Sequence, residues 1–488
     1  MQLTVDGLDD IPFKQNATIR VSVNIQPASP RTESLPTNRF VGSILVMLGR
    51  GAKALTLMKP QERNYWLDTI AMPLGTHGDL PDRVDVAIVG AGFTGLSAAR
   101  ALAKHGVAVA VLETNTVGWG ASSRNGGMVL TGLKLGIESL VKRYGMELAR
   151  QMYAASLASI DMVEQIVKQD QIECNFSRCG HLEVACKQSH FDTYARSVHM
   201  IAREFSHQLR ILRKEDLQAE IGSEIYFGGI VDEQSAGLNP ARYAAGLAAA
   251  ALREGACIYE GTRVQSIESL ASRGEAGFRL RTSRGLLCAR DAFVATSGYT
   301  SSATPFLHKK VIPVGSFIIV TEPLPDSLAQ ELSPRNRMIY DSKHYLYYYR
   351  LTPDNRLLFG GRAAFFPETR STVRKSAEIL QRGMIEVYPQ LRNAAVEYVW
   401  GGTLDFCFDT MPHAGRREGM YYSLGYAGHG VALATYLGAQ IAAEIMGAPS
   451  YNPYEKIRFP GAPLGLYNGR PWFLPLAGAY YKVLDWIS

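Results

Sequence analysis

The sequence has few cysteines, and their arrangement argues against two classes of protein. Six cysteines, at positions 174, 179, 186, 257, 288 and 407, form no CxxC pair, and the first three are irregularly spaced. Structural zinc sites and disulfide frameworks need characteristic cysteine spacings. We therefore expect free thiols, no bound metal and the reducing environment of the cytoplasm.

Targeting and membrane-spanning patterns are also missing. The N-terminus, MQLTVDGLDD, is acidic and lacks an apolar stretch, which argues against a signal peptide. The most apolar region, Val41–Met58, contains Arg50 and Lys53, and its uninterrupted part is too short to span a bilayer. These features predict a cytoplasmic protein without a transmembrane segment, although Val41–Leu48 and residues 472–488 leave peripheral membrane contact open.

The chain carries no stripe of positive charge. Its net charge is only +6, and basic pairs such as Lys309-Lys310 and Arg416-Arg417 are isolated. Nucleic-acid-binding surfaces need clustered basic residues, so we expect no nucleic-acid partner. With 488 residues, 47% of them hydrophobic and 20% charged, the chain is a globular protein large enough for two or three domains.

The most informative feature present is the segment RVDVAIVGAGFTGLSAARALAKHGVAVAVLE at 83–113. An apolar strand, Asp85–Val89, runs into a GxGxxG turn, and a second strand, Val107–Leu112, ends at Glu113. In this turn the second glycine lets a pyrophosphate approach the backbone, and the third lets the helix pack closely on the strands. The carboxylate can accept both ribose hydroxyls, so the segment predicts a bound dinucleotide.

Two later motifs indicate that the dinucleotide is a flavin. The loop Trp119–Gly127, WGASSRNGG, supplies hydroxyl, guanidinium and amide donors that a nicotinamide dehydrogenase does not need there. A second strand, glycine turn and helix at Tyr421–Gly438 places another helix N-terminus at a ligand, where it suits the flavin edge that gains negative charge on reduction. His429 in this turn is either catalytic or serves backbone geometry and hydrogen bonding.

The order of elements predicts an interleaved α/β protein. Nucleotide-type elements occupy 83–130, recur at 237–300 and return at 400–447, and two segments of different character separate them. We expect one helix over Leu140–Val167, strands over Ser177–Ala185 and Cys257–Ile267, and mostly strands from Val311 to Gly361. A sheet interleaved with a second domain explains this order better than a tandem arrangement.

Several motifs, in order along the chain, resemble those of the D-amino-acid-oxidase-type FAD-dependent oxidoreductases. They are GAGFTGLSAARALA, GWGASSRNGG, ATSGY, WGGTLDFCFDTMPHAG and GYAGHGVALATYLG. The lead-in Tyr65–Thr69 and the tail from Gly469 to Pro475 are most similar to the γ-glutamylputrescine-oxidase-like branch. The resemblance covers about residues 60–488, and residues 1–60 form an extension of unknown role.

The resemblance implies a glutathione-reductase-like FAD-binding Rossmann domain interleaved with a mixed β-sheet substrate domain. We assign 61–145, 225–305 and 395–450 to the FAD-binding domain, 146–224 and 306–394 to the substrate domain, and 451–488 to a tail. With the motifs above it implies these FAD-binding residues: Gly90, Gly92, Phe93, Thr94, Gly95, Glu113, Thr114, Trp119, Gly120, Ala121, Ser122, Ser123, Arg124, Asn125, Gly126, Gly127, Val264, Ser297, Gly298, Gly402, Gly428, His429, Gly430 and Val431.

The resemblance also bears on how FAD is held and reoxidised. The flavin-linked cysteine of the sarcosine-oxidase branch aligns nearer Gly402 than Cys407, which favours non-covalent FAD. The oxygen-activating lysine of that branch corresponds to Leu358, so oxygen reactivity depends on other cations or gives way to another acceptor.

Candidate substrate-side residues lie in the strands at 345–350 and 356–361. Alternate residues of a strand share a face, so Tyr348 and Arg350 face one way and Tyr347 and Tyr349 the other. Family members use arginine and tyrosine here to hold a carboxylate, and Arg362 ends its strand on the flavin side. The alternative, that the tyrosines pack and the arginines pair, stays open for each residue.

The leading hypothesis is an enzyme that oxidises the C–H bond next to an amine nitrogen in an amino acid, N-substituted amino acid or polyamine conjugate. Hydride passes to flavin N5, the imine hydrolyses, and oxygen or another acceptor reoxidises the flavin; Arg362, Tyr348, Arg350 and His429 are the catalytic candidates. The alternatives are a membrane-associated dehydrogenase that feeds a quinone or carrier, and a flavin-binding protein without turnover.

Overall fold

A computed structural model describes residues 60–361 and 370–487, which lie in one compact unit. The predicted extension, including Val41–Leu48, and the candidate residue Arg362 lie outside the described residues. None of the described helices is both long enough and apolar enough to cross a membrane.

The first sheet has a parallel centre of five strands in the order β18-β11-β1-β2-β8. Antiparallel strands extend it, because β17 pairs with β18, and β10 pairs with both β11 and β9. The strands are β1 (Arg83–Val89), β2 (Val109–Leu112), β8 (Cys257–Tyr259), β9 (Val264–Ser269), β10 (Phe278–Thr282), β11 (Gly285–Val294), β17 (His413–Arg417) and β18 (Met420–Leu424).

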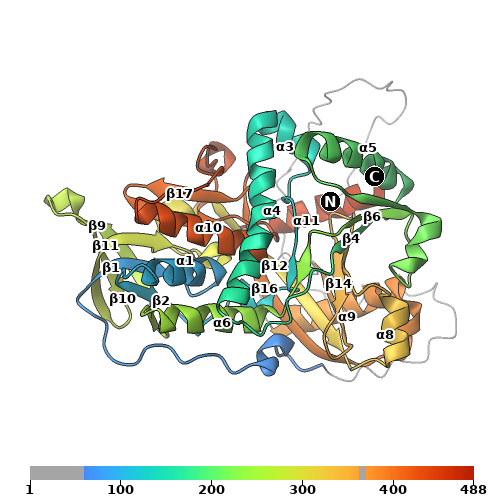
Figure 1. The fold of residues 1–488 in the computed structure, drawn as a ribbon, viewed down its shortest axis with the longest axis horizontal. Coiled ribbons are helices and arrows are strands. Elements are labelled where there is room, and N and C mark those ends of the chain that lie inside the picture. The colour runs from blue at the N-terminus through green and yellow to red at the C-terminus, as the bar shows by residue number, and fades with distance from the viewer. Residues whose placement is uncertain (1–59, 362–369, 488) are drawn as a thin grey trace, which may run out of the picture. The chain divides into compact units, whose positions relative to one another are not determined.

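Small-residue helices cover this sheet. Figure 1 shows α1 (Phe93–Ala103) and α10 (Gly430–Ile445) beside its strands, with α6 (Pro240–Arg253) below α1. Alanine and glycine let helix and sheet backbones approach closely, and a Cβ on Gly95 would lie 2.0 Å from the carbonyl oxygen of Gly90. This close packing fixes where α1 begins relative to the end of β1.

The second sheet is mixed, in the order β16-β12-β15-β14-β13-β4-β6-β5, and only the β13–β4 pair within it is parallel. Its strands are β4 (His181–Val184), β5 (Arg210–Arg213), β6 (Gly228–Asp232), β12 (Val311–Thr321), β13 (Met338–Asp341), β14 (Tyr347–Leu351), β15 (Leu357–Gly361) and β16 (Val396–Cys407). Helices α8 (Asp326–Leu332) and α9 (Arg370–Val387) contribute to the apolar core on one face.

These two sheets alternate along the chain, which confirms the predicted fold class. Strand membership differs from the predicted domain segments in two places, since β6 and β16 belong to the second sheet. The helix α4 (Met146–Gln169), predicted in the substrate domain, packs through Met152, Ile160 and Val163 into the core that contains α1 and α10. The domain boundaries themselves stay a prediction.

Some predicted elements are interrupted. Gly145, with a φ of +82°, separates α3 (Ile137–Tyr144) from α4 where one helix was expected, because a left-handed residue ends a helix. The predicted strand Ser177–Ala185 is reduced to β4, and Cys257–Ile267 is two strands, β8 and β9.

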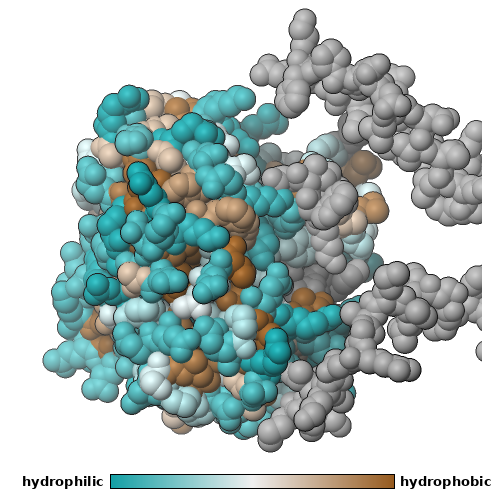
Figure 2. Space-filling view, turned by 90° about the vertical axis from the view of Figure 1, so that its right-hand side faces the viewer, coloured by the Kyte–Doolittle hydropathy of each residue, from teal (hydrophilic) through white to brown (hydrophobic). Residues whose placement is uncertain are grey.

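The remaining elements are short or lie at the surface. They are α2 (Ala121–Arg124), β3 (Met128–Val129), α5 (Gln188–Phe205), β7 (Ala236–Gly237), α7 (Pro305–His308) and α11 (Leu474–Ile487). The face seen in Figure 2 is mostly hydrophilic, with hydrophobic residues in smaller groups among the polar ones.

Candidate functional site

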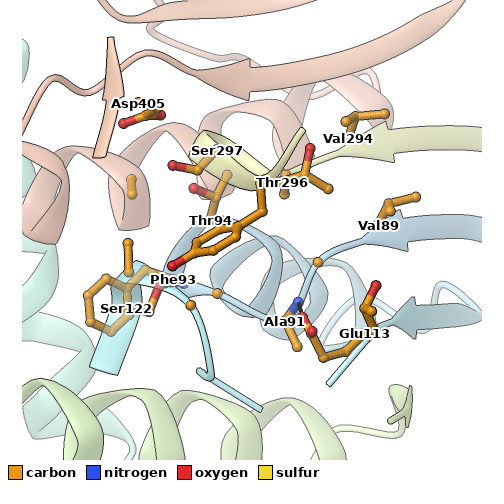
Figure 3. Close-up of a pocket in the computed structure, with 18 of the residues that line it drawn as sticks. Val89, Ala91, Phe93, Thr94, Glu113, Ser122, Val294, Thr296, Ser297 and Asp405 are labelled. Atoms are coloured by element: carbon orange, nitrogen blue, oxygen red, sulfur yellow. Dashed lines mark hydrogen bonds between the residues drawn. The ribbon is translucent and has the colours of Figure 1, made fainter. Parts of the chain in front are cut away.

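A cavity of about 390 Å³ opens where β1 and β11 end and α1 begins. This size is within the usual range for a cofactor site, and the end of parallel strands is the usual place for one. Most of the predicted FAD-binding residues line it: Gly90, Gly92, Phe93, Thr94, Glu113, Thr114, Trp119, Gly120, Ala121, Ser122, Asn125, Val264, Ser297, Gly428, Gly430 and Val431. Figure 3 shows several of them converging from separate elements.

The N-terminus of α1 lies at this cavity, and its N-cap residue has no side chain that could cap it. Gly92 is the N-cap residue, and a Cβ there would lie 2.8 Å from the hydroxyl oxygen of Ser122. That hydroxyl in turn accepts a hydrogen bond of 2.9 Å from the backbone N–H of Phe93. Backbone donors and the positive end of the helix dipole are therefore brought to a place that a side chain would fill.

Glu113 lies at the end of β2, on the rim of the same cavity. Its carboxylate accepts hydrogen bonds from the backbone N–H of Ala91 at 2.9 Å and of Asn115 at 2.8 Å, and Figure 3 shows it turned toward Ala91. Burial raises its pKa, and these backbone donors oppose the rise. The carboxylate is thus held in one orientation, as the predicted contact with ribose hydroxyls requires.

The N-terminus of α10 reaches the same cavity through Gly428, Gly430 and Val431. Two contacts tie α10 to α1: the Ser97 hydroxyl donates to the Thr435 carbonyl at 2.7 Å, and a Cβ on Gly438 would lie 2.2 Å from the Thr94 carbonyl oxygen. Because the helices pack at small residues, both positive helix ends point at one cavity. This geometry fits a ligand with two electron-rich regions, such as FAD.

His429 is the N-cap residue of α10, and its buried Nδ1 has no hydrogen-bond partner among the described residues. Burial lowers its pKa to about 3, and the nearby Lys134 and His181 add to the effect. The imidazole is therefore neutral at physiological pH, and an unsatisfied buried nitrogen is available for a hydrogen bond from or to a ligand.

A second cavity of about 150 Å³ adjoins the first and shares Ala121, Asn125, Leu404, Gly428 and Val431 with it. Predicted residues that line this second cavity alone are Arg124, Gly126, Gly402, His429 and Tyr348. Sequence reasoning missed the others that matter here: Met128, Leu130, Lys134, Ser316, Tyr340, Leu346 and Phe406. They come from four separated segments, and of these residues only Phe406 lies in a motif noted in the sequence.

Tyr348 forms part of the wall that the second sheet gives to this cavity. Its ring lies against Gly360, where a Cβ would be 2.2 Å from the Tyr348 Cζ, and its hydroxyl lies 3.3 Å from the hydroxyl of Ser316. Burial raises its pKa to about 12, so the phenol stays protonated and able to donate. Tyr349 faces the other way and stacks on Phe359, as strand alternation predicts.

Arg350 occupies a different place from the one its predicted role needs. It is buried, and its guanidinium donates to the carbonyls of Gly127 at 3.1 Å, Leu238 at 3.0 Å and Leu351 at 3.2 Å. It is not among the residues that line either cavity. Its contacts support the backbone beneath the site, because Arg350 satisfies carbonyls of three segments at once.

The remaining predicted residues shape the backbone around the cavities without lining them. A Cβ on Gly127 would lie 2.1 Å from the Leu238 carbonyl oxygen, and one on Gly298 would lie 2.9 Å from Thr403 Cγ2. Ser123 is buried and its carbonyl accepts from the Asn64 amide at 2.8 Å. Together with Gly95, these residues permit close approaches.

The loop shared by the two cavities is fixed from both sides by tryptophan. The indole N–H of Trp66, in the Tyr65–Thr69 lead-in, donates to the Asn125 carbonyl at 2.9 Å, and that of Trp400 donates to the Arg124 carbonyl at 3.0 Å. The Arg124 guanidinium donates to the carbonyls of Trp119 and Gly401 at 2.8 Å and 3.0 Å. The lead-in therefore has a role that its sequence alone did not reveal.

Asp405 and Tyr426 line the first cavity although neither was predicted. Burial raises the pKa of Asp405, whose carboxylate accepts from the Gly425 N–H at 2.6 Å and from the Ser297 hydroxyl. The Tyr426 hydroxyl lies 2.7 Å from the Thr94 hydroxyl. Both residues lie inside motifs noted in the sequence, so that signal was present, but nothing in a motif says which side chains point inward.

Together, a Rossmann-type sheet, two helix ends on one cavity and an adjoining second cavity define a dinucleotide-dependent oxidoreductase. Residues 85–444 match the family described as DAO, FAD dependent oxidoreductase, and the chain belongs to this family. The match confirms the resemblance seen in the sequence.

Relatives of this chain extend over most of its length. A probable oxidoreductase OrdL from Haemophilus influenzae is 33% identical over 414 residues, which are 83% of this chain and 92% of that protein. Gamma-glutamylputrescine oxidoreductase from Escherichia coli is 32% identical over 405 residues, 82% of this chain and 92% of that protein.

The fold is similar to that of glycine oxidase from Geobacillus kaustophilus, with a TM-score of 0.65 and 22% identity over 78% of this chain and all (100%) of that one. It is also similar to iminodiacetate oxidase from Chelativorans sp., with a TM-score of 0.62 and 21% identity over 77% of this chain and 98% of that one.

Proposed function

We propose that this FAD-dependent oxidoreductase removes hydride from a carbon next to an amine nitrogen, and that the resulting imine hydrolyses to a carbonyl compound and an amine or ammonia. The observation that carries the proposal is the second cavity, which adjoins the first and is lined by hydroxyl and cationic groups within an apolar wall. When bound, FAD supplies the hydride acceptor.

The side chains around this second cavity favour a substrate that carries a carboxylate. Arg124 and Lys134 are the charged side chains among its lining residues, and no aspartate or glutamate is among them. An anionic group is therefore better matched than a second ammonium. The names of two relatives, gamma-glutamylputrescine oxidoreductase and glycine oxidase, support an amine substrate that also bears a carboxylate.

The chain's own residues then bind, orient and exclude water. Glu113 and the ends of α1 and α10 would hold the cofactor, and the Tyr348 hydroxyl offers a donor to the substrate. Met128, Leu130, Leu346 and Phe406 give the cavity an apolar lining, which strengthens the polar contacts inside it. Arg362 stays the predicted carboxylate anchor, and Lys134 is a second candidate.

FAD is proposed to bind without a covalent link. Cys407 is buried in an apolar cluster with Val294, Leu307 and Leu424, and no cysteine is among the residues that line either cavity. Acid precipitation of the yellow protein is expected to release FAD into the supernatant. Colour that stays in the pellet would contradict the non-covalent assignment.

Either oxygen or another acceptor is proposed to reoxidise the flavin. Leu358 is buried in an apolar cluster with Ile318, Val320 and Trp400, so a cation near the substrate comes from Lys134 or Arg124 instead. Stoichiometric hydrogen peroxide in air identifies an oxidase. Substrate reduction of the flavin that persists in air identifies a dehydrogenase.

One observation favours the membrane-associated alternative. Leu476 and Tyr480, one turn apart on α11, and the preceding Trp472 are 69%, 60% and 63% exposed. Exposed aromatic and leucine side chains at helical spacing suit the interface of a bilayer. Flotation of the protein with anionic vesicles, compared with Leu476→Glu, tests this alternative.

The principal experiment is anaerobic bleaching of the purified protein. Amines, amino acids, N-substituted amino acids and polyamine conjugates are added in turn, and the flavin absorbance is followed. Bleaching by an amine that carries a carboxylate is expected. A protein that binds FAD and is bleached by none of these compounds would be a flavin-binding protein without this activity.

A further inference from the structure

Behind the second cavity lies a group of buried, titratable side chains that the hydride chemistry does not use. The Tyr340 side chain lines the cavity, and its hydroxyl donates to Glu183 Oε2 at 3.3 Å. The same hydroxyl lies 3.3 Å from His181 Nε2. A tyrosine that lines the cavity is thus connected through its hydroxyl to an acid and to a base, neither of which lines the cavity itself.

Strand register creates this arrangement. In the parallel β4–β13 pair, Tyr340 lies opposite Glu183, and His181 precedes Glu183 by two residues on the same face. The His181 and Tyr340 rings stack with centroids 5.3 Å apart. The Glu183 carboxylate is fixed from its other oxygen, which accepts from the Tyr194 hydroxyl at 2.9 Å.

A second set of hydrogen bonds fixes His181. Its Nδ1 lies 2.8 Å from the Ser235 hydroxyl, which also accepts from the Thr131 N–H at 3.2 Å. The Thr131 hydroxyl donates to Asp232, which lies 3.1 Å from His207 Nε2. A partnered Nδ1 leaves Nε2 to face Tyr340.

Charged and titratable groups surround the acid and the base on every side. Those that act on Glu183, His181 or Tyr340 are Lys134, Tyr153, Tyr194, His207, Asp232, Arg337 and Asp341, and His429 is also near His181. Lys134 favours the ionised form of Glu183, and burial, the larger effect, raises the pKa of this carboxyl. Burial also raises the pKa of Tyr340 and lowers that of His181, so the phenol and the imidazole are both neutral.

We propose that Tyr340 and Glu183 remove the proton of the substrate ammonium group before hydride leaves. The ammonium N–H gives its proton to the Tyr340 oxygen as the Tyr340 O–H gives its own to Glu183 Oε2. The substrate becomes a neutral amine, Glu183 becomes a carboxylic acid, and Tyr340 is a neutral phenol before and after. Tyr340 is the catalytic residue in this step, and Glu183 acts through it.

This step rests on the proposed function, because removal of hydride requires a neutral amine nitrogen. Hydride leaves a carbon only with help from a nitrogen lone pair, and an ammonium has none. An alkyl ammonium has a pKa like that of lysine, about 10.4, so at pH 7 roughly one molecule in 2,500 is neutral. Because the second cavity has a volume of only about 150 Å³, a group bound in it lies near the Tyr340 hydroxyl.

The first test measures proton release when a ligand binds to the FAD-loaded protein. The probe is an analogue of a bleaching substrate with a methyl group in place of each hydrogen on the carbon beside nitrogen, so it is not oxidised. Calorimetry at pH 8 in two buffers of different ionisation enthalpy counts the protons. The ligand is expected to bind as the neutral amine in every variant. In the wild type Glu183 keeps the proton, so little is released, whereas in Glu183→Gln and Tyr340→Phe about one proton per ligand passes to the buffer.

The second test is the pH dependence of anaerobic flavin reduction, as the second-order rate constant between pH 6 and pH 10. At pH 7 Glu183→Gln and Tyr340→Phe are expected to lose about 100-fold, and near pH 10 most of the difference disappears because roughly a quarter of the amine is then neutral in solution. Tyr226→Phe is the matched control, since its buried hydroxyl accepts from Tyr349 in the core on the opposite face of the sheet. It is expected to keep the wild-type profile.

Outcomes separate this inference from the proposed function. The pH–rate profiles of Glu183→Gln and Tyr340→Phe could differ from the wild-type profile only by one constant factor, with the same proton release as the wild type. That result would overturn the role of Tyr340 and Glu183 in proton removal, while the proposed oxidation stands. Absence of bleaching in the wild type by every amine would overturn the proposed function.

Discussion

The two cavities are built in different ways. The first is formed largely by backbone, at turns and helix ends where Gly92, Gly428 and Gly430 leave room, and one side chain, Glu113, adds a fixed carboxylate. The second is formed by side chains, among them Lys134, Ser316, Tyr340 and Tyr348, which strand pairing brings together. A backbone site depends on a few short patterns, whereas a side-chain site depends on the register of a whole sheet.

This difference determines which property a mutation in each cavity changes. Substitution of a glycine in the first cavity removes space, which no rotamer change restores. Substitution in the second cavity changes one contact among several and leaves the fold intact. Variants of the first cavity should therefore alter cofactor retention, and variants of the second should alter substrate kinetics with FAD still bound.

The largest effect is expected from Gly92→Val, which should abolish FAD retention. Its Cβ would lie 2.8 Å from the Ser122 hydroxyl oxygen, and the branched side chain would occupy the approach of the pyrophosphate. Flavin content after gel filtration measures the effect. Gly136→Ala is the control, because its Cβ meets no atom within 4 Å and its φ is −60°. A folded Gly92→Val variant with normal FAD affinity would mean that the nucleotide site has been misplaced.

Next in size is the loss of the carboxylate anchor. Arg362→Ala is expected to lose several kcal/mol of transition-state stabilisation without releasing FAD, roughly 100-fold or more in kcat/KM. Arg362→Lys is expected to raise the half-saturating substrate concentration, because an ammonium does not reproduce the guanidinium fork. Anaerobic flavin-reduction rates against substrate concentration give both values.

Lys134→Ala in the same assay decides between the two cations. If Lys134 is the anchor, this variant and not Arg362→Ala loses discrimination between a substrate and its methyl ester. Unchanged kinetics in both variants would point to Arg124 or to a substrate without a carboxylate.

A smaller effect is expected from Glu113→Ala in the first cavity. The loss of a hydrogen bond to a charged group costs about 1.5–3 kcal/mol, so FAD should bind about 10- to 150-fold more weakly. Glu113→Gln keeps an acceptor of the same shape and should lose less. Titration of the apoprotein with FAD measures the dissociation constants of the wild type, Glu113→Ala and Glu113→Gln. Equal values would contradict the predicted contact between Glu113 and the ribose.

The smallest effect is expected where the cavities meet. Trp66→Phe removes the N–H that donates to the Asn125 carbonyl at 2.9 Å, and Trp400→Phe removes the one that donates to the Arg124 carbonyl at 3.0 Å. Each should weaken FAD binding by about 0.5–1.5 kcal/mol, the usual net value of one hydrogen bond. Because both indoles hold one loop, the double variant tests whether the losses add. Loss of substrate binding alone would mean that this loop serves only the second cavity.

Sequence reasoning predicted the first cavity much better than the second. The strand, glycine turn and helix at 83–113 are local, so spacing alone located Gly92 and Glu113. The two sheets, the strand alternation at Tyr348 and Tyr349, and the family were also predicted. Local patterns carry this information because the backbone geometry that they require is itself local.

What the sequence did not reveal depends on contacts between distant segments. Tyr340 and Glu183 are adjacent only because β13 pairs in parallel with β4, and no local sequence pattern near either residue predicts that pairing. Arg350 was predicted as a substrate contact because family members use arginine in this sheet and Arg350 shares a face with Tyr348, yet its guanidinium donates to three backbone carbonyls. Strand alternation gives the face of a residue but not its partners.

The packing of α1 on α10 determines when the protein can acquire its cofactor during synthesis. Ser97 and Thr435, which hold these helices together, are 338 residues apart in the chain. The GxGxxG turn is synthesised early, but the N-terminus of α10 is synthesised only after most of the polypeptide has been made. Until then the first cavity lacks the residues that α10 contributes to it. FAD capture is therefore a late event, and a chain that ends before α10 should emerge colourless although its best-known motif is intact.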